Sequence, residues 1–282
     1  MSAILMNGSE LAARVRAEVA EQVRELGHVA LATILVGDAP ASQVYVGHKH
    51  KDCAEVGIES IDHRLPDDAS EDQVLALVRE LNDDEGIDGF IVQSPVPSQI
   101  CEPRVMEAID PIKDVDGFSP VNVGRLWLGR EGHVSATPLG IMELLRAYDV
   151  ELEGADAVIV GRSAIVGKPM AALLLRENAT VTFCHTRTRD MAERTRKADL
   201  LIAAAGRAGL IQPEMVKPGA TVIDVGITRT ENGLVGDVEG SVAEIAGRLT
   251  PVPGGVGPMT RAMLLTNTVQ AARARRGLLA FD

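Results

Sequence analysis

Aromatic side chains are scarce in this sequence of 282 residues, which holds one Trp, two Tyr and four Phe. So few rings cannot supply the stacking platforms on which single-stranded nucleic acids bind. Basic residues are also in the minority, because 28 Lys and Arg face 40 Asp and Glu and leave a formal net charge of −12. Since such a chain repels polyanions and anionic lipid surfaces, we expect no nucleic acid and no membrane among its partners.

Cysteine is equally sparse. Cys53, Cys101 and Cys184 are far apart and form no Cys-x-x-Cys pair, which excludes a disulfide framework and a thiolate zinc site. We predict no metal site, because His48 and His50 are two residues apart on a predicted helix and point in different directions. No basic segment precedes an apolar leader, and no apolar run reaches the roughly 18 residues that span a bilayer. We therefore expect a cytoplasmic protein.

The length allows two domains at about 150 residues each. Short β-branched runs alternate with longer stretches of helical period, which is typical of an α/β protein with parallel sheets. The predicted strands cover residues 31–36, 89–93, 157–160, 181–184, 200–204 and 222–225, and the predicted helices cover 11–26, 42–56, 67–81 and 260–276. Ser42 and Thr260 are the expected N-caps and Gly57 the expected stop. Between Gly117 and about Thr137 we predict a loop, after which a second α/β series begins.

A candidate nucleotide loop follows the strand 157–160. Gly161 permits a tight turn, Gly167 permits close approach of the backbone, and Pro169 suits the first turn of a following helix. The free N–H groups and the dipole of that helix favour a pyrophosphate. Ser163 stands where the usual G-x-G-x-x-G motif has its middle glycine. These residues alone therefore also fit an ordinary strand-to-helix turn.

The strand 181–184 distinguishes between nicotinamide cofactors. An NAD site generally places a carboxylate about 20 residues past the loop, where it holds the ribose diol. Here Thr186 and Arg187 follow the strand and no carboxylate does, while Arg162 adds a fork-shaped donor suited to phosphate. The residues favour NADP over NAD, although Arg187 by itself also fits a solvated strand end.

Polar residues of the first half converge on one predicted sheet edge. Tyr45 and Lys49 are four apart and share a helix face. Gln93 closes the strand 89–93, and the carboxyl ends of parallel strands are the usual place for ligands. Asp116 lies in a turn, where an aspartate also serves as a simple turn former.

Four segments resemble motifs of the bifunctional methylenetetrahydrofolate dehydrogenase/methenyltetrahydrofolate cyclohydrolase (FolD) family. They are residues 45–51, 88–97, 113–117 and 251–260, and the segments 161–169 and 222–227 fit the same family. The resemblance runs in order from about Leu31 to Thr268, and the string PGGVGPMT at 253–260 is very specific.

The resemblance implies a fold, an activity and an assembly. The fold would be a small α/β catalytic domain, residues 1–118 with 261–282, and a Rossmann-type NADP-binding domain, residues 119–260, facing each other across a cleft. The last helix would return to the first domain. The enzyme would oxidise 5,10-methylenetetrahydrofolate with NADP and hydrolyse the methenyl product to 10-formyltetrahydrofolate. It would be a cytoplasmic homodimer of one-carbon metabolism that serves purine biosynthesis.

The resemblance also assigns roles to residues. Lys49 would handle proton transfers, which requires a pKa below the unperturbed value of about 10.4. Gln93 would orient Lys49, Tyr45 would pack near the folate ring, and Asp116 would bind the aminopyrimidine. The remaining expected substrate contacts are Pro253, Gly254 and Gly255. The expected cofactor contacts are Gly161, Arg162, Ser163, Val166, Gly167, Thr186, Arg187 and Ile227.

Two other functions remain open at this point. The chain could be a dehydrogenase without hydrolase activity, or a folate- or nucleotide-binding protein without catalysis. The presence of Lys49 and Gln93 argues against the loss of hydrolysis.

Overall fold

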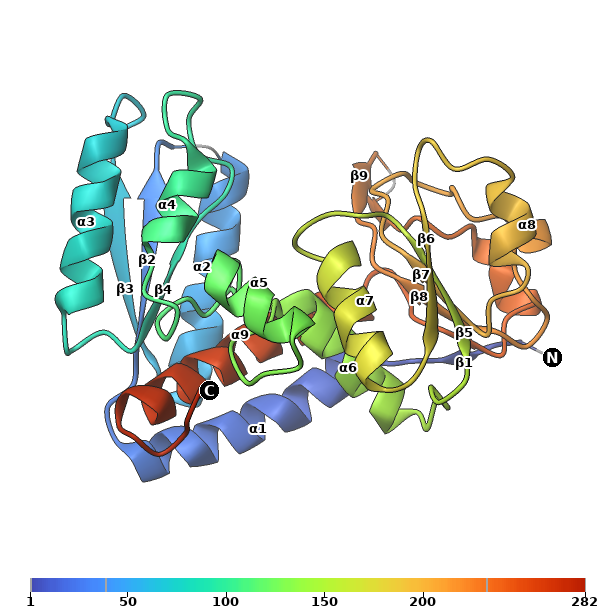
Figure 1. Cartoon of the computed structure of the whole chain (residues 1–282), viewed down its shortest axis with the longest axis horizontal. Coiled ribbons are helices and arrows are strands. Elements are labelled where there is room, and N and C mark those ends of the chain that lie inside the picture. Colours follow the sequence, from blue (N-terminus) through green and yellow to red (C-terminus); the bar gives the residue numbers. More distant parts are fainter. Residues whose placement is uncertain (1, 39, 232, 282) are drawn as a thin grey trace. The chain divides into compact units, whose positions relative to one another are not determined.

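The chain forms two compact α/β units in the computed structural model, which describes residues 2–38, 40–231 and 233–281, and of residues 40–45 the backbone only (Figure 1). The six-stranded unit contains the residues up to Ala12 together with Thr137–Thr260. The three-stranded unit contains Ala13–Ala136 and the residues from Arg261 on, so the last helix returns to it as expected. These units place the residues up to Ala12 and residues 119–136 differently from the expected domain bounds.

The six-stranded unit is built on a parallel sheet of order β1-β11-β8-β7-β5-β6. Its strands are β1 (Ile4–Leu5), β5 (Asp156–Val160), β6 (Thr180–Cys184), β7 (Leu200–Ala203), β8 (Thr221–Asp224) and β11 (Arg248–Leu249), and β9 (Thr228–Thr230) and β10 (Gly233–Val235) form a separate antiparallel ribbon. The helices are α6 (Ala136–Ala147), α7 (Gly167–Arg176), α8 (Met191–Thr195), and the 3-10 turns η1 (Pro213–Met215) and η2 (Gly240–Glu244). The central strands are buried and read as continuous apolar runs, as strands covered on both faces do.

The strand order of this sheet locates its ligand edge. From β5 the chain runs outward to β6 on one side, then back to β7, β8 and β11 on the other. The order therefore reverses between β5 and β7. In doubly wound sheets a ligand binds at the carboxyl ends of the strands at such a switch point.

The three-stranded unit has a parallel sheet of order β3-β2-β4. Its strands are β2 (Ala30–Val36), β3 (Glu59–Leu65) and β4 (Gly89–Val92). Its helices are α1 (Gly8–Leu26), α2 (Pro40–Val56), α3 (Glu71–Asp83), α4 (Glu102–Ala108), α5 (Pro120–Trp127) and the later part of α9 (Val256–Arg275). This order also reverses, between β2 and β4, so the carboxyl ends of those two strands are the expected ligand edge.

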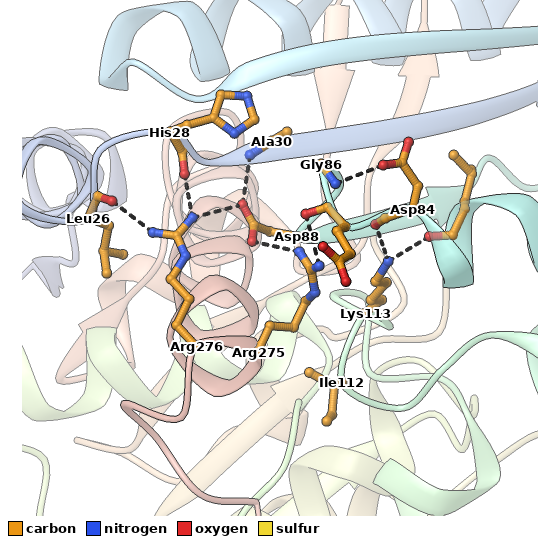
Figure 2. A network of polar contacts seen from close by, with 12 residues as sticks. Leu26, His28, Ala30, Asp84, Gly86, Asp88, Ile112, Lys113, Arg275 and Arg276 are labelled. Carbon is orange, nitrogen blue, oxygen red and sulfur yellow. Dashed lines mark hydrogen bonds and ion pairs between the residues drawn. The ribbon is translucent and has the colours of Figure 1, made fainter.

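The end of α9 is anchored at the opposite edge of this sheet. The carboxylate of Asp88, just before β4, accepts a hydrogen bond from the Ala30 N–H at 3.0 Å and pairs with Arg275 at 2.9 Å and Arg276 at 3.4 Å (Figure 2). Arg276 also donates to the carbonyls of Leu26 and His28. Buried carboxylates persist where they are paired and hydrogen-bonded in this way.

The predicted strands are confirmed within a residue or so, and the structure adds what the pattern missed. The strand β3 was not predicted. The helix α5 occupies the predicted loop, where Ser119 caps it by accepting from the Asn122 N–H at 3.3 Å. The helix α3 begins at Glu71 behind the N-cap Ser70, rather than at residue 67.

Two predicted N-caps are wrong. The helices α2 and α9 start earlier, at Pro40 and Val256, so Ser42 and Thr260 lie inside them. The Thr260 hydroxyl instead lies 3.3 Å from the Val256 carbonyl and 3.0 Å from the Thr137 hydroxyl. Gly57 follows α2 with φ +83°, which confirms the predicted stop.

Candidate functional site

Lys49 and Gln93 meet at the ligand edge of the three-stranded unit. The helix α2 follows β2 and carries Lys49, whereas Gln93 comes directly after β4. The Lys49 ammonium donates a hydrogen bond of 3.2 Å to Gln93 Oε1. Gln93 Nε2 is held in turn by the Ser94 carbonyl at 2.8 Å, beside the cis Ser94–Pro95 bond. Two residues that are distant in the chain thus form one polar contact.

Burial changes the acid–base character of Lys49. Loss of hydration lowers the pKa of this ammonium below its ordinary value of 10.5, while the charge of Asp116 acts in the opposite direction. A lowered pKa increases the fraction of neutral amine, which is the form that can accept a proton.

Asp116 is the carboxylate whose charge acts on Lys49. Burial raises the pKa of this carboxyl from 3.8 to about 6, with Lys49 lowering it and Asp114 raising it further. Each group therefore stabilises the charged form of the other, and burial opposes both charges. A carboxylate held with so little solvation gains when a ligand with paired N–H donors replaces the lost water.

The turn that carries Asp116 is fixed by two residues that the sequence did not indicate. The Asp114 carboxylate accepts from the Phe118 and Ser119 N–H groups at 3.2 and 2.8 Å. The buried Asn267 amide on α9 donates to the carbonyls of Val115 and Val134, both at 2.8 Å. The main chain on the amino side of Asp116 is therefore clamped by the last helix.

Tyr45 lies in α2, four residues before Lys49, but its side chain is outside the described residues.

His50, which was considered as a metal ligand, lies 2.7 Å from Asp62. Within the described residues no three His, Cys, Asp or Glu side chains gather as metal ligands would.

The predicted nucleotide loop lies at the switch point of the six-stranded sheet. Gly161 follows β5 with φ +133°, and a Cβ atom there would lie 2.2 Å from the Ala204 carbonyl oxygen. A Cβ atom at Gly167, the first residue of α7, would lie 2.6 Å from the Gly161 carbonyl oxygen. Both glycines are thus required by close backbone packing.

Ser163 replaces the middle glycine of the motif and has a structural role here. Its hydroxyl accepts from the N–H groups of Val166 and Gly167 at 3.1 and 3.4 Å, which closes the loop onto the start of α7. The loop lies at the protein surface, where Arg162 is exposed.

The end of β6 lies beside this loop because β6 pairs with β5. Residues 185–188 form a tight turn in which the His185 N–H donates to the Thr188 hydroxyl at 2.8 Å. Thr186 and Arg187 are exposed on this turn. Within the described part of the chain, no carboxylate pairs with the Arg162 or Arg187 guanidinium, so both cations are available to an added phosphate.

The remaining predicted contacts also belong to the six-stranded unit. Ile227 follows β8 and is 51% exposed. The segment with Pro253 and Gly254 is fixed by a hydrogen bond of 3.0 Å from the Ser9 N–H to the Gly254 carbonyl. A Cβ atom at Gly255 would lie 2.6 Å from the Pro251 carbonyl oxygen. Pro253 follows a cis bond.

These features fit a dinucleotide with a 2′-phosphate. Gly161 and Gly167 leave no room for a Cβ atom, a helix begins directly behind the loop, and two exposed guanidinium groups lie on the loop and on the turn after β6. A doubly wound sheet with such a loop, joined to an α/β unit with a half-buried lysine, defines a two-domain nicotinamide-dependent enzyme.

Comparison with known proteins narrows this class. Residues 6–116 match the family model described as tetrahydrofolate dehydrogenase/cyclohydrolase, catalytic domain, and residues 135–276 match the NAD(P)-binding domain of the same family. The chain is 50% identical to the bifunctional protein FolD of Ruminiclostridium cellulolyticum, over 99% of this chain and 100% of the relative. It is 55% identical to bifunctional protein FolD 1 of Rubrobacter xylanophilus, over 96% and 98%.

Comparison with solved structures indicates the same family. A crystal structure of the bifunctional FolD methylenetetrahydrofolate dehydrogenase/cyclohydrolase from Campylobacter jejuni has a TM-score of 0.96 and 49% identity, covering 97% of this chain and 100% of that one. The Trypanosoma brucei FolD structure, complexed with NADP cofactor and inhibitor, has a TM-score of 0.92 and 38% identity, covering 99% and 100%.

The chain therefore belongs to the tetrahydrofolate dehydrogenase/cyclohydrolase family, whose activities are those of an oxidoreductase and a hydrolase. This confirms the predicted family, the two-domain α/β fold, the two activities and the nicotinamide cofactor, which is NADP in one relative. Among the described residues no helix is both long and apolar enough to cross a membrane.

Proposed function

We propose that this chain oxidises 5,10-methylenetetrahydrofolate to 5,10-methenyltetrahydrofolate with NADP and then hydrolyses the methenyl product to 10-formyltetrahydrofolate. The observation that carries the proposal is the Lys49–Gln93 contact of 3.2 Å, in the unit that matches the family's catalytic domain. A lysine with a lowered pKa, fixed at a sheet edge by a neutral amide, has the properties of a proton carrier.

In the hydrolysis, Lys49 acts as a general base. As a neutral amine, it takes a proton from the water that adds to the methenyl carbon. The bond from that carbon to the pterin ring nitrogen then breaks, the formyl C=O forms, and the hydroxyl proton passes to the ring nitrogen. One molecule of substrate cation and one of water give 10-formyltetrahydrofolate and one proton. The positive charge of the substrate further favours the neutral amine.

Gln93, Asp116 and Tyr45 place the folate against Lys49. Gln93 Oε1 accepts from the ammonium and so fixes its direction. Asp116 as a carboxylate would accept two parallel hydrogen bonds from the aminopyrimidine. Tyr45 would pack near the folate ring, and the loop with Pro253, Gly254 and Gly255 would approach the substrate through its backbone.

NADP, when bound, accepts the hydride in the oxidation. The exposed backbone of Gly161, Arg162 and Ser163 would hold the pyrophosphate, together with Val166 and Gly167 at the start of α7. Thr186, Arg187 and Arg162 would hold the 2′-phosphate. Ile227 would cover the cofactor from the end of β8.

The test is a spectrophotometric assay of the purified protein. With 5,10-methylenetetrahydrofolate and NADP we expect reduction of the cofactor, and with NAD a slower reaction. With methenyltetrahydrofolate alone we expect faster absorbance decay than in buffer. Reduction without accelerated decay would support a dehydrogenase lacking hydrolysis, whereas neither reaction would support a binding protein.

We further propose that the protein is a cytoplasmic homodimer joined through its NADP-binding domains, which supplies one-carbon units to purine biosynthesis. Sedimentation should then give about 60 kDa, twice the 29.9 kDa of one chain. A particle of 29.9 kDa at micromolar concentration would contradict the dimer.

A further inference from the structure

A buried carboxylate outside the predicted site holds a loop at the switch point of the six-stranded sheet. Asp237 is 0% exposed. One of its oxygens accepts from the N–H groups of Ala205 and Gly206 at 2.6 and 2.9 Å, and the other accepts from the Arg207 N–H at 2.7 Å. Three consecutive backbone donors thus converge on one side chain.

The loop held by Asp237 borders the candidate cofactor surface. Residues 205–207 follow β7, the neighbour of β5 across the switch point. The residue before them, Ala204, has the carbonyl oxygen that a Cβ atom at Gly161 would meet at 2.2 Å. The position of this loop therefore determines where the backbone of the Gly161 turn can lie.

A second carboxylate fixes Asp237 itself. Asp224, the last residue of β8, accepts from the N–H groups of Asp237 and Val238 at 2.8 and 3.1 Å. Gly236 leaves the space that this contact needs, since a Cβ atom there would lie 1.8 Å from Asp224 Oδ2. The pair therefore ties the ends of β7 and β8 together.

Stability alone does not account for this pair. Neither Asp224 nor Asp237 has a basic partner in the part of the chain that the structure describes, and burial of like charges is unfavourable. Main-chain bonds already join the same segments, from Gly209 N–H to Gly236 at 3.1 Å and from Ile211 N–H to Asp237 at 2.9 Å. The carboxylate of Asp237 adds control of residues 205–207 in particular.

We propose that Asp237 is a positioning residue for the dehydrogenase reaction, which holds the loop 205–207 in the conformation that binds the cofactor beside Gly161. This inference rests on the proposed function. Asp237 also holds this loop in one conformation. Without its carboxylate, the three convergent N–H groups of the loop would form an anion-binding nest, which would compete with the cofactor site for phosphate.

The experiment compares Asp237→Asn and Asp237→Ala with the unaltered protein. NADP binding is measured by calorimetry, the KM for NADP by the reductive assay, and hydrolysis by methenyl decay without cofactor. We expect the Kd and KM for NADP to rise about tenfold or more, because two or three charge-assisted hydrogen bonds are lost. Hydrolysis needs no nicotinamide, so its rate should stay within about twofold.

Asp199→Asn is the matched control. Asp199 lies just before β7, at the opposite edge of the same sheet, and accepts from the Asp156 N–H at 3.0 Å and pairs with Lys217 at 2.5 Å. This change should lower stability without changing the Kd for NADP. An unchanged Kd in both Asp237 variants would overturn the proposal, and so would a parallel loss of hydrolysis, because that pattern indicates general unfolding.

Should neither Asp237 variant fold, amide hydrogen exchange of the unaltered protein decides. Protection of the Ala205, Gly206 and Arg207 amides without NADP, increased by NADP, supports the proposal, and exchange at the unprotected rate overturns it. The absence of NADP-dependent oxidation in the unaltered protein would contradict the proposed function, while the calorimetric comparison would still test Asp237.

Discussion

Lys49 can accept a proton only as a neutral amine, and burial is what favours that form. The charge of Asp116 favours the ammonium, so it opposes the effect of burial on the pKa of Lys49. Proton carriers work best when their pKa lies near the working pH. The balance of burial against one carboxylate is therefore the feature that suits this lysine to hydrolysis.

Replacement of Lys49 should separate the two activities. We expect Lys49→Ala to reduce hydrolysis by about 100-fold or more, the usual contribution of a general base, and to reduce hydride transfer much less. Lys49→Arg should fail in the same way, because a guanidinium stays protonated. Rates are measured by methenyl decay and by NADPH formation, with the exposed Lys51→Ala as control. A normal hydrolysis rate in Lys49→Ala would refute the assignment.

The hydrolysis rate of the unaltered protein should rise with pH through the pKa of Lys49. Because burial lowers that pKa, the rise should occur at lower pH than for a free lysine. The measurement is the pH profile of kcat for methenyl decay, corrected for the uncatalysed rate at each pH.

Replacement of Asp116 should weaken folate binding but increase the stability of the protein at pH 8. Its pKa is raised from 3.8 to about 6, so the stability linked to it is present below 3.8 and is lost as pH rises through 6. Asp116→Asn should therefore be more stable than the parent at pH 8, by about 3 kcal/mol at most, and unfold at a higher temperature there, but show no gain at pH 3.5. The KM for folate should rise about tenfold at pH 8. Equal melting curves at pH 8 would contradict the burial of a charged Asp116.

Arg162 and Arg187 should select between the two nicotinamide cofactors. The double change to Ala should weaken NADP by about 100-fold, with NAD changed by less than about threefold, because only NADP carries the 2′-phosphate. Calorimetry with each cofactor measures this. Arg196→Ala, exposed beyond α8 in the same unit, controls for net charge. Equal losses for both cofactors would exclude a 2′-phosphate role.

The sequence predicts the meeting of Lys49 and Gln93 because helix period and strand ends follow local rules. Asn267 and Asp237 could not be predicted in the same way. Each acts on main-chain groups of residues distant in the sequence, and a backbone N–H or carbonyl has no signature of its own. The sequence also does not reveal which glycines lie close to carboxylates. Gly236 is such a glycine, and its role is recognised only in the folded structure.

At the scale of elements, α9 is attached to the three-stranded unit at two levels. Asn267 holds the turn before Asp116, and Arg275 and Arg276 hold Asp88 at the amino ends of β2 and β4 (Figure 2). The helix thus contributes Asn267 near the candidate site and Arg275 at the far edge of the sheet, where Arg276, the residue after the helix, joins it.

Asp88→Asn should destabilise the protein without altering its chemistry. Removal of one member of a buried ion pair costs about 3 kcal/mol, since two half-buried guanidinium groups lose their carboxylate. We expect a lower urea midpoint and unchanged kcat per folded molecule. Glu21→Gln is the matched control, because its pair with Arg24 is more than 70% exposed on both sides and should contribute little. A midpoint no lower than that of the control would contradict the anchoring role.

The elements that the pattern missed have identifiable causes. The sequence of β3, ESIDHRL, is polar because this strand is largely half-exposed, so it lacks the apolar run that marks the buried strands β2 and β4. The start of α5 was marked by Ser119 and Pro120, a capping residue followed by proline, within a segment whose glycines suggested a loop.

At the scale of the whole molecule, two chemistries depend on two units of one chain. The residues that we propose for hydrolysis, Lys49, Gln93 and Asp116, belong to the three-stranded unit, and the candidate cofactor residues belong to the six-stranded unit. This division is why a change such as Asp237→Ala is expected to affect one reaction and leave the other intact.

The strand β1 has a consequence for biosynthesis. Ile4 and Leu5 pair with Arg248 and Leu249, which come much later in the chain. Asp88 likewise forms its ion pairs with Arg275 and Arg276, near the end of the chain. On the ribosome, the six-stranded unit therefore lacks the partner of β1 until β11 has been translated, and the three-stranded unit lacks the partners of Asp88 until the end of α9 has been translated. The nascent chain must keep the exposed Ile4 and Leu5 strand and the Asp88 carboxylate unpaired through most of its synthesis, a period in which chaperones have an open edge to bind.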